Sequence, residues 1–334
     1  MSHPEHTDHS PPPSSRVLSG VIQRNAIEDL ARAVSQFFTL DSSQLEPGQF
    51  KCQIEFAAAG QTLVYREDYA CRIHARGELI GDRFGLGIIT GGPGAIFSGA
   101  TMTESTVASA MTGEELDIVA PRGFGQIIMM VDQKSLYELA EDAGLGAGVL
   151  GNLRLGRSGM PLVARPEAVY AVQKKFNALL DEAASGSLHL HQDELEDLVY
   201  EAMLSVIDTD DVSSGRPSSS VVVRRAIEVF QASGGFLRMA NIYRRLNVSP
   251  KTLQNAFRTV TGLSPRSFFQ RVMLNRARRA LLASDSEEDK VTAIAAKLGF
   301  TELGRFAVRY RELFGESPSE TLHRQKRAPV AIPL

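Results

Sequence analysis

The sequence predicts a multidomain α+β protein, with a β-rich N-terminal domain flanked by helices and an all-α C-terminal domain. Three observations support this prediction. Residues 239–326 contain two copies of a helix-turn-helix pattern, residues 49–132 alternate apolar and polar side chains, and the net charge changes sign between the two regions. A chain of 334 residues is long enough for two domains. We expect the following segments: a disordered tail at 1–20, a β-rich domain with flanking helices at 21–210, a linker at 211–220, an all-α domain at 221–326 and a tail at 327–334.

The N-terminal domain begins with polar sequence and then changes to a helical pattern. Ser-Pro-Pro-Pro-Ser-Ser at 10–15 is typical of a disordered tail. An amphipathic helix is predicted over 25–38. From residue 49 the period changes to two, and short runs are separated by Gly, Pro and Asp turns. Many short strands at this spacing predict a sandwich or barrel. The predicted strands are 50–56, 61–65, 69–76, 84–90, 95–100, 115–119 and 126–132.

Two amphipathic helices are predicted after the strands, over 165–184 and 192–207. Each has apolar residues at helical spacing, so each must bury one face against the strands or against a second subunit. The Ser-rich segment 211–220 contains Gly and Pro and has the composition of a linker.

The C-terminal repeat has a short amphipathic helix, a break and a second, cation-rich helix in each copy. Asn247 and Gly299 stand at the two breaks. Glycine adopts positive φ without strain, and asparagine is the next most tolerant residue there. A helix with one buried and one cationic face fits the major groove of DNA.

A long uninterrupted helix is predicted between the two copies. Ser264 and Pro265 are a favourable start, and no further Gly or Pro occurs up to Leu282. Twenty helical residues span roughly 30 Å, and one turn of DNA is about 34 Å. The spacer therefore has a suitable length to hold two recognition helices in successive major grooves.

The charge distribution agrees with this division. Residues 219–334 contain 20 Lys and Arg against 9 Asp and Glu, whereas residues 1–218 contain 16 against 30. The chain as a whole has a net charge of −3. A basic C-terminal region suits a polyanion, because phosphate contacts supply most non-specific DNA affinity.

These motifs resemble those of a known family. The stretch Gly-Phe-Thr-Glu-Leu-Gly-Arg-Phe-Ala-Val-Arg-Tyr-Arg-Glu-Leu-Phe-Gly-Glu-Ser-Pro-Ser (299–319) is similar to the signature of the AraC/XylS transcriptional regulators. The runs 252–257 and 303–307 resemble most the branch of ethanolamine-utilisation regulators. The resemblance implies a cupin-like N-terminal barrel that binds an effector, a homodimer, and an activator that contacts RNA polymerase.

The outward faces of the two recognition helices supply the predicted DNA contacts. Gln and Asn suit adenine, and Lys and Arg suit guanine. A valine at 308 and a glycine at 304 predict that the second helix reads fewer bases than the first. The predicted base contacts are Lys251, Gln254, Asn255 and Arg305, and the predicted phosphate contacts are Arg258, Arg309 and Arg311.

The effector prediction rests on a cationic patch in the β-rich domain. If 69–76 is one strand, its alternating side chains place three cation-capable groups on one face. Guanidinium groups match phosphates and carboxylates. The spacing also resembles the cyclic di-GMP motif of PilZ-type domains, although Phe84 stands where that motif has Ser. The predicted effector residues are Arg66, Arg72, His74, Arg76 and Asp82.

Two alternatives to an anionic effector stay open. The cationic patch is equally consistent with a solvated strand face paired with Glu67, Asp68 and Glu78. An amine effector, which the ethanolamine branch suggests, would need carboxylates or aromatic faces in the cavity. Residues Glu55, Tyr65 and Tyr69 are candidates for that role.

Other function classes find little support in the sequence. A cupin-type enzyme fused to a DNA-binding domain would need closely spaced metal ligands, yet His74 is the only histidine in the predicted barrel. We expect no catalytic residue, cofactor or metal site. An architectural DNA-binding protein without a ligand would not need the separate β-rich domain. Two cysteines, Cys52 and Cys71, and no 18-residue apolar run predict a cytoplasmic protein without a membrane span.

Overall fold

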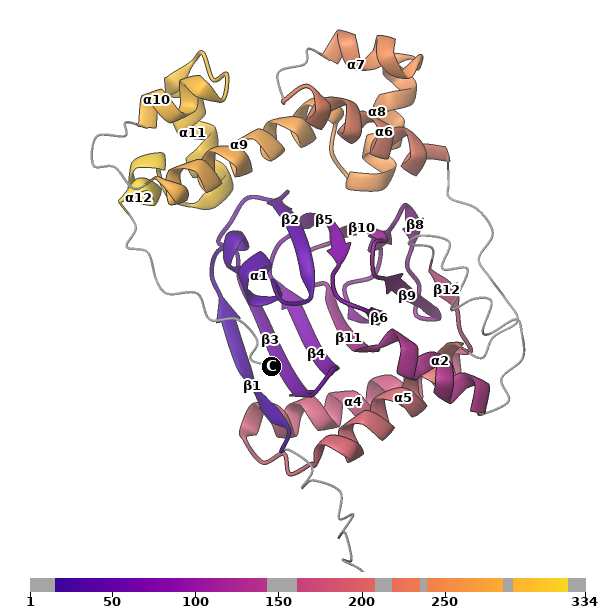
Figure 1. The fold of residues 1–334 in the computed structure, drawn as a ribbon. Coiled ribbons are helices and arrows are strands. Elements are labelled where there is room, and N and C mark those ends of the chain that lie inside the picture. Colours follow the sequence, from indigo (N-terminus) through magenta and orange to yellow (C-terminus); the bar gives the residue numbers. More distant parts are fainter. Residues whose placement is uncertain (1–15, 143–160, 208–217, 235–238, 285–290, 324–334) are drawn as a thin grey trace, which may run out of the picture.

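Figure 1 shows the computed structural model, which describes residues 16–142, 161–207, 218–234, 239–284 and 291–323. The N-terminal half contains two antiparallel sheets, and the C-terminal part is entirely helical. This confirms the predicted α+β class. Most of the tail predicted at 1–20, most of the linker and the tail predicted at 327–334 lie outside the described residues, and strand β1 begins at Leu18 within the first of these segments.

The larger sheet has seven strands in the order β1-β3-β4-β11-β6-β9-β12. Its strands are antiparallel throughout, and β11 lies at its centre between β4 and β6. The strand bounds are β1 Leu18–Arg24, β3 Cys52–Ala59, β4 Thr62–Tyr69, β6 Arg83–Gly91, β9 Thr106–Met111, β11 Gly125–Asp132 and β12 Leu162–Val163.

The smaller sheet has five strands in the order β2-β5-β10-β7-β8, and these pairs are also antiparallel. Its bounds are β2 Phe38–Gln44, β5 Ile73–Leu79, β7 Ile96–Phe97, β8 Ala100–Thr101 and β10 Glu115–Ala120. The two sheets face each other around one apolar core that also receives helix α1, Ile27–Ala33. The expected barrel therefore takes the form of two packed sheets.

Helices cover the outer face of the seven-stranded sheet. Helices α2 (Gln133–Asp142), α4 (Pro166–Ser185) and α5 (Gln192–Ile207) contribute to a second core with this sheet. In Figure 1, α4 and α5 lie on the side of the β-rich domain away from the C-terminal helices. Apolar residues at helical spacing, such as Val172, Phe176 and Leu180 on α4, produce this packing.

Seven helices make up the C-terminal part that the structure describes. The long helix α9 connects two groups of shorter helices (Figure 1). It confirms the predicted spacer. The helix bounds are α6 Ser218–Ala232, α7 Met239–Leu246, α8 Pro250–Thr261, α9 Pro265–Ala283, α10 Val291–Lys297, α11 Leu303–Phe314 and α12 Pro318–Leu322.

Two predicted elements differ from the structure. The helix expected over 25–38 ends at Ala33, and strand β2 begins at Phe38 because it pairs with β5. The strand expected over 69–76 is divided, because residues 70–72 carry the chain from one sheet to the other. Strands β1, β2, β9 and β12 and helix α2 were not predicted.

Candidate nucleic-acid interface and ligand cavity

Helices α7 and α8 form the first helix-turn-helix. Asn247 lies in the turn with a φ of 53°, as its position at the predicted break requires. Ser249 caps α8, because its Oγ accepts a hydrogen bond from the backbone N–H of Thr252 at 3.1 Å. Pro250 occupies the first turn of α8, where its missing N–H removes no helical hydrogen bond. The turn and cap therefore fix where α8 starts.

The two faces of α8 differ sharply in burial. Leu253, Phe257 and Val260 are buried against α6 and α9 in one apolar cluster. The predicted base contacts Lys251, Gln254 and Asn255 are exposed, as is the predicted phosphate contact Arg258. The N-terminal half of α8 thus offers amide and ammonium donors to a groove.

Helices α10 and α11 form the second helix-turn-helix around Gly299, which has a φ of 80°. Phe306, Tyr310 and Leu313 are buried on the inner face of α11. On its outer face Arg305 pairs with Glu302 at 2.8 Å, and both side chains are mostly exposed. A surface pair of this kind is weak, so Arg305 remains available to a stronger partner.

The two other predicted phosphate contacts of α11 also have protein neighbours. The guanidinium of Arg309 lies beside the amide of Gln270 on α9. Arg311 lies 3.6 Å from a carboxylate oxygen of Glu320 on α12, and both side chains are exposed. These contacts are on the surface and leave both cations near solvent.

The predicted effector residue Arg66 lies on the helix-covered face of the seven-stranded sheet. Its guanidinium donates to Glu55 at 2.8 Å, to Asn177 at 2.9 Å and to Asp181 at 2.8 Å. It therefore joins β3 and β4 to α4. Another predicted effector residue, Asp82, is exposed in the turn between β5 and β6.

Three other predicted effector residues point from the five-stranded sheet toward the C-terminal helices. The guanidinium of Arg72, just before β5, donates to the backbone oxygen of Thr261 at 3.0 Å. His74 and Arg76 share one face of β5, as strand alternation predicts. The structure does not bring these three together with Arg66 and Asp82, so the anion clamp stays a prediction.

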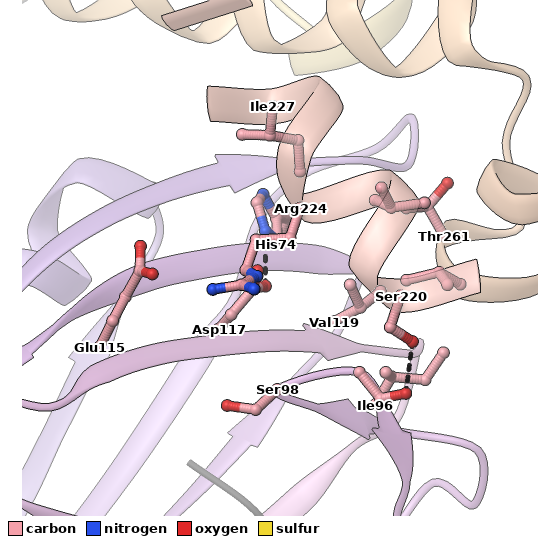
Figure 2. Close-up of a pocket in the computed structure, with 13 residues that line it drawn as sticks. His74, Ile96, Ser98, Glu115, Asp117, Val119, Ser220, Arg224, Ile227 and Thr261 are labelled. Atoms are coloured by element: carbon pink, nitrogen blue, oxygen red, sulfur yellow. Dashed lines mark hydrogen bonds and ion pairs between the residues drawn. The ribbon is translucent and has the colours of Figure 1, made fainter. Parts of the chain in front are cut away.

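Both side chains on this face of β5 have partners in the two domains. His74 lies 2.9 Å from Asp117 on β10, and its ring is 5.3 Å from the ring of Phe268 on α9. Arg76 contacts Glu115 and donates to Gln231 on α6 at 3.2 Å. Figure 2 shows the small pocket beside these contacts, with His74 and Asp117 facing α6.

A cavity of about 90 Å³ lies inside the β-rich domain, between the two sheets. Its wall is mostly apolar, with a small polar group formed by Tyr65, Glu67, Tyr69, Ser109 and Gln126. The five-stranded sheet contributes Leu40, Ala75, Leu116 and Ile118 to the wall.

Glu67 is the charged side chain in this wall. It is 3% exposed, and the amide of Gln126 donates a hydrogen bond to its Oε1. Burial raises the pKa of Glu67 above its ordinary value, while hydrogen bonds from Tyr69 and Gln126 and the nearby charge of Asp68 have smaller effects. Burial likewise raises the pKa of Tyr65 and of Tyr69.

Sequence reasoning located this polar group in part. Tyr65 and Tyr69, the candidates for an amine effector, line the cavity. Glu55, the third candidate, lies on the opposite face of the sheet and pairs with Arg66. Glu67 was considered there as a surface partner for cations, but the alternation Tyr65-x-Glu67-x-Tyr69 on one strand is the signal that places it with the tyrosines.

In the described ranges, no group of three or more His, Cys, Asp or Glu side chains is arranged to hold a metal ion. Among the described helices, none has the length and apolar character needed to cross a membrane. The two cysteines are both buried and free, and burial raises the pKa of Cys71 to about 11.

Comparison with known proteins matches the C-terminal part of the chain. A helix-turn-helix domain model matches residues 242–324. A protein described as a probable thc operon regulatory protein of Rhodococcus erythropolis is 35% identical over 108 residues, which are 32% of this chain and 32% of that protein. The XylDLEGF operon transcriptional activator of Pseudomonas putida is 32% identical over 129 residues, 39% of each chain.

One solved structure with similar sequence is a probable AraC family transcriptional regulator from Rhodopseudomonas palustris. It is 35% identical, and the match covers 30% of this chain and 94% of that one, with a TM-score of 0.29. The matches span about a third of the length of the two curated relatives. The tandem helix-turn-helix and these matches define a DNA-binding domain. This domain is similar to the DNA-binding domain of the AraC/XylS family of transcriptional regulators.

Proposed function

We propose that this protein is a sequence-specific transcription regulator that reads DNA with α8 and α11 and senses a small molecule with its β-rich domain. The observation that carries the first part is the exposed polar face at the start of α8, where Lys251, Gln254 and Asn255 stand together over a buried apolar face. Side chains near the start of a recognition helix are those that reach base edges. The curated relatives named as operon regulators support the same reading.

The sensing part of the proposal rests on the five-stranded sheet. Along β5, Ala75 lines the cavity, whereas its neighbours His74 and Arg76 face the C-terminal helices. Along β10, Ile118 lines the cavity, and Val119 packs in the apolar cluster of α6 and α8. One sheet therefore separates the cavity from the DNA-binding domain. A ligand that displaces this sheet would alter the contacts on its other face.

The proposal includes two further partners expected from the sequence, a second copy of the chain and RNA polymerase. The names of the Pseudomonas putida relatives as transcriptional activators support contact with RNA polymerase. Sedimentation of the full chain, alone and on DNA, measures the number of copies bound to one DNA site.

The direct test of the proposal is selection of DNA from a random library by the full chain. We expect enrichment of one sequence motif, and binding to that motif tighter than to random DNA by a factor of about 10³ or more. Recovery of no motif, with equal affinity for all sequences, would contradict sequence-specific regulation.

A further inference from the structure

Glu67 is a buried carboxylate whose hydrogen-bond partners are neutral. It lies on β4, two residues before the end of the strand, with its side chain toward the cavity, between Tyr65 and Tyr69 on the same strand face. Its hydrogen-bond donors are the amide of Gln126 and the hydroxyl of Tyr69. In the described part of the chain, no Lys, Arg or His side chain is among the residues that line this cavity.

Two other carboxylates with buried side chains in the described part of the chain have cationic partners. Glu55 pairs with Arg66 at 2.8 Å, and Glu28 pairs with Arg278 at 3.0 Å. This is the usual arrangement, because an unpaired buried charge is costly. Glu67 departs from it inside a cavity, and such groups are concentrated at functional sites.

Small residues keep the space in front of Glu67 open. Gly85 and Gly87 on β6 have no side chain where the cavity lies, and Ala108 and Ala110 stand opposite on β9. A Cβ on Gly87 would approach no atom closer than 3.5 Å, so the fold leaves room for a methyl group there. An unfilled cavity lowers stability by the contacts that its wall does not make. Its retention together with an unpaired carboxylate points to a ligand.

We propose that this cavity binds a small organic cation, a primary alkylammonium group whose charge pairs with the carboxylate of Glu67. The inference rests on the proposed sensing function and gives the chemical class of its ligand. The ammonium would donate to Glu67 beside the rings of Tyr65 and Tyr69, whose faces also attract cations. The apolar tail would contact the wall formed by Leu40, Ile118 and Ile128.

The size of the cavity limits the ligand. An apolar cavity of about 150 Å³ accommodates benzene, so a space of about 90 Å³ takes on the order of four heavy atoms without movement of the wall. An anion of the same size would meet the like charge of Glu67. A neutral alcohol would fit, but it would leave the carboxylate without a counter-charge.

The experiment compares three ligands of similar size and different charge. Calorimetry and thermal shift of the full chain are measured with n-propylammonium, n-propanol and propionate, with methyl-, ethyl- and n-butylammonium completing the cation series. We expect saturable binding of at least one ammonium ion, with affinity at least ten-fold above that of propanol and no binding of propionate. Equal binding of propanol and propylammonium, or no binding of any ammonium ion at millimolar concentration, would overturn the proposal.

Three variants test separately the carboxylate of Glu67, the open space of the cavity and the effect of removing any buried carboxylate. Glu67→Gln keeps the shape and removes the charge, and we expect at least a ten-fold loss of ammonium affinity. Gly87→Leu fills the space, and we expect loss of all ligand binding. Glu55→Gln is the matched control, because it removes a buried carboxylate from the opposite face of the sheet and should retain ammonium binding. Undiminished binding by Glu67→Gln would overturn the proposal even if the other variants fail to fold.

A DNA-binding measurement on the same wild-type sample keeps the two proposals separate. Selective DNA binding without any ammonium binding would reject this ligand class and leave the regulatory function intact. Ammonium binding without selective DNA binding would reject the regulatory function and leave the site intact.

Discussion

Asn275 of α9 and Gln44 of β2 exchange two hydrogen bonds between the two domains. The backbone N–H of Gln44 donates to Asn275 Oδ1 at 3.0 Å, and Asn275 Nδ2 donates to the backbone oxygen of Gln44 at 3.1 Å. Asn275 is fully buried. Its side-chain amide pairs with the backbone N–H and oxygen of Gln44, as the backbone of a neighbouring strand would. The long helix that separates the two helix-turn-helix copies is thereby attached to the sheet that borders the cavity.

We predict that Asn275→Ala weakens this attachment. The substitution leaves a backbone donor and a backbone acceptor of Gln44 without partners, which costs about 1–3 kcal/mol for each buried group. Denaturant unfolding of the full chain measures the change. Asn241→Ala is the control, because Asn241 accepts a hydrogen bond from exposed Arg244. Equal, small losses in both variants would contradict the assigned role of Asn275.

Arg278 should make a larger contribution to the same interface. Its guanidinium is buried and pairs with Glu28 next to the β-rich core at 3.0 Å and with Glu316 before α12 at 2.6 Å. Arg278→Ala would remove the buried cation that these two carboxylates share, and we expect a loss of about 3–5 kcal/mol in unfolding free energy. Arg279→Ala, which removes a partly exposed pair with Asp41, should cost at most about 1 kcal/mol. Similar losses for the two arginines would contradict this account.

The raised pKa of Glu67 predicts a pH dependence of stability. The folded protein holds this proton more tightly than the unfolded chain does, so stability falls as pH rises from the ordinary value of 4.5 through the raised pKa. Glu67→Gln lacks this titration. We expect the melting temperature of Glu67→Gln minus that of wild type to increase with pH in this window. Asp68 and Tyr69 of β4 are the titratable groups that shift the pKa of Glu67, and the charge of Glu67 in turn raises the pKa of Cys52 on β3 and of Tyr65 on β4.

The outcome at pH 7 distinguishes a ligand-binding carboxylate from a structural one. If Glu67→Gln is at least as stable as wild type at pH 7, the charge of Glu67 does not stabilise the fold, which agrees with a role of that charge in ligand binding. If Glu67→Gln were less stable by the same amount at every pH, the carboxylate would contribute through its hydrogen bonds alone, and the predicted pH dependence would be wrong.

The second recognition helix is predicted to read fewer bases than the first. On the outer face of α11, Val308 is 59% exposed and Gly304 has no side chain. Arg305 is therefore the one predicted base contact that α11 contributes. Arg305→Ala should relax sequence preference in the half of the DNA site that α11 contacts and leave the other half unchanged. DNA selection with this variant measures both halves. A distal half with undiminished sequence preference would refute the assignment.

Sequence patterns located the helices better than the strands. Helix α5 spans 192–207 as predicted, because its apolar residues repeat at helical spacing and Asp and Glu fill its first turn. Strand β9, Thr-Val-Ala-Ser-Ala-Met, was missed because small residues give it little alternation in hydropathy. The division of 69–76 was missed because a chain that turns between sheets keeps the composition of a strand.

The partners of the cationic patch could not be read from the sequence. Arg72 meets Thr261 and Arg76 meets Gln231, residues more than 150 positions away, because the domains pack together. Alternation showed correctly that His74 and Arg76 share a face. It gave no information on whether that face meets solvent, a ligand or another domain.

The central claim is that α8 reads bases through the side chains at its start. We expect Gln254→Ala and Asn255→Ala each to weaken binding to the selected DNA motif by about 1–3 kcal/mol and to change binding to random DNA little. Arg258→Ala, a control on the same helix, should weaken both by similar factors, because a phosphate contact carries no sequence information.

Fluorescence anisotropy of Gln254→Ala on the selected motif and on random DNA, at one fixed salt concentration, is the most direct measurement. The account predicts a loss of about five- to 150-fold on the motif alone. An equal loss on both DNAs, or no loss on either, would contradict it.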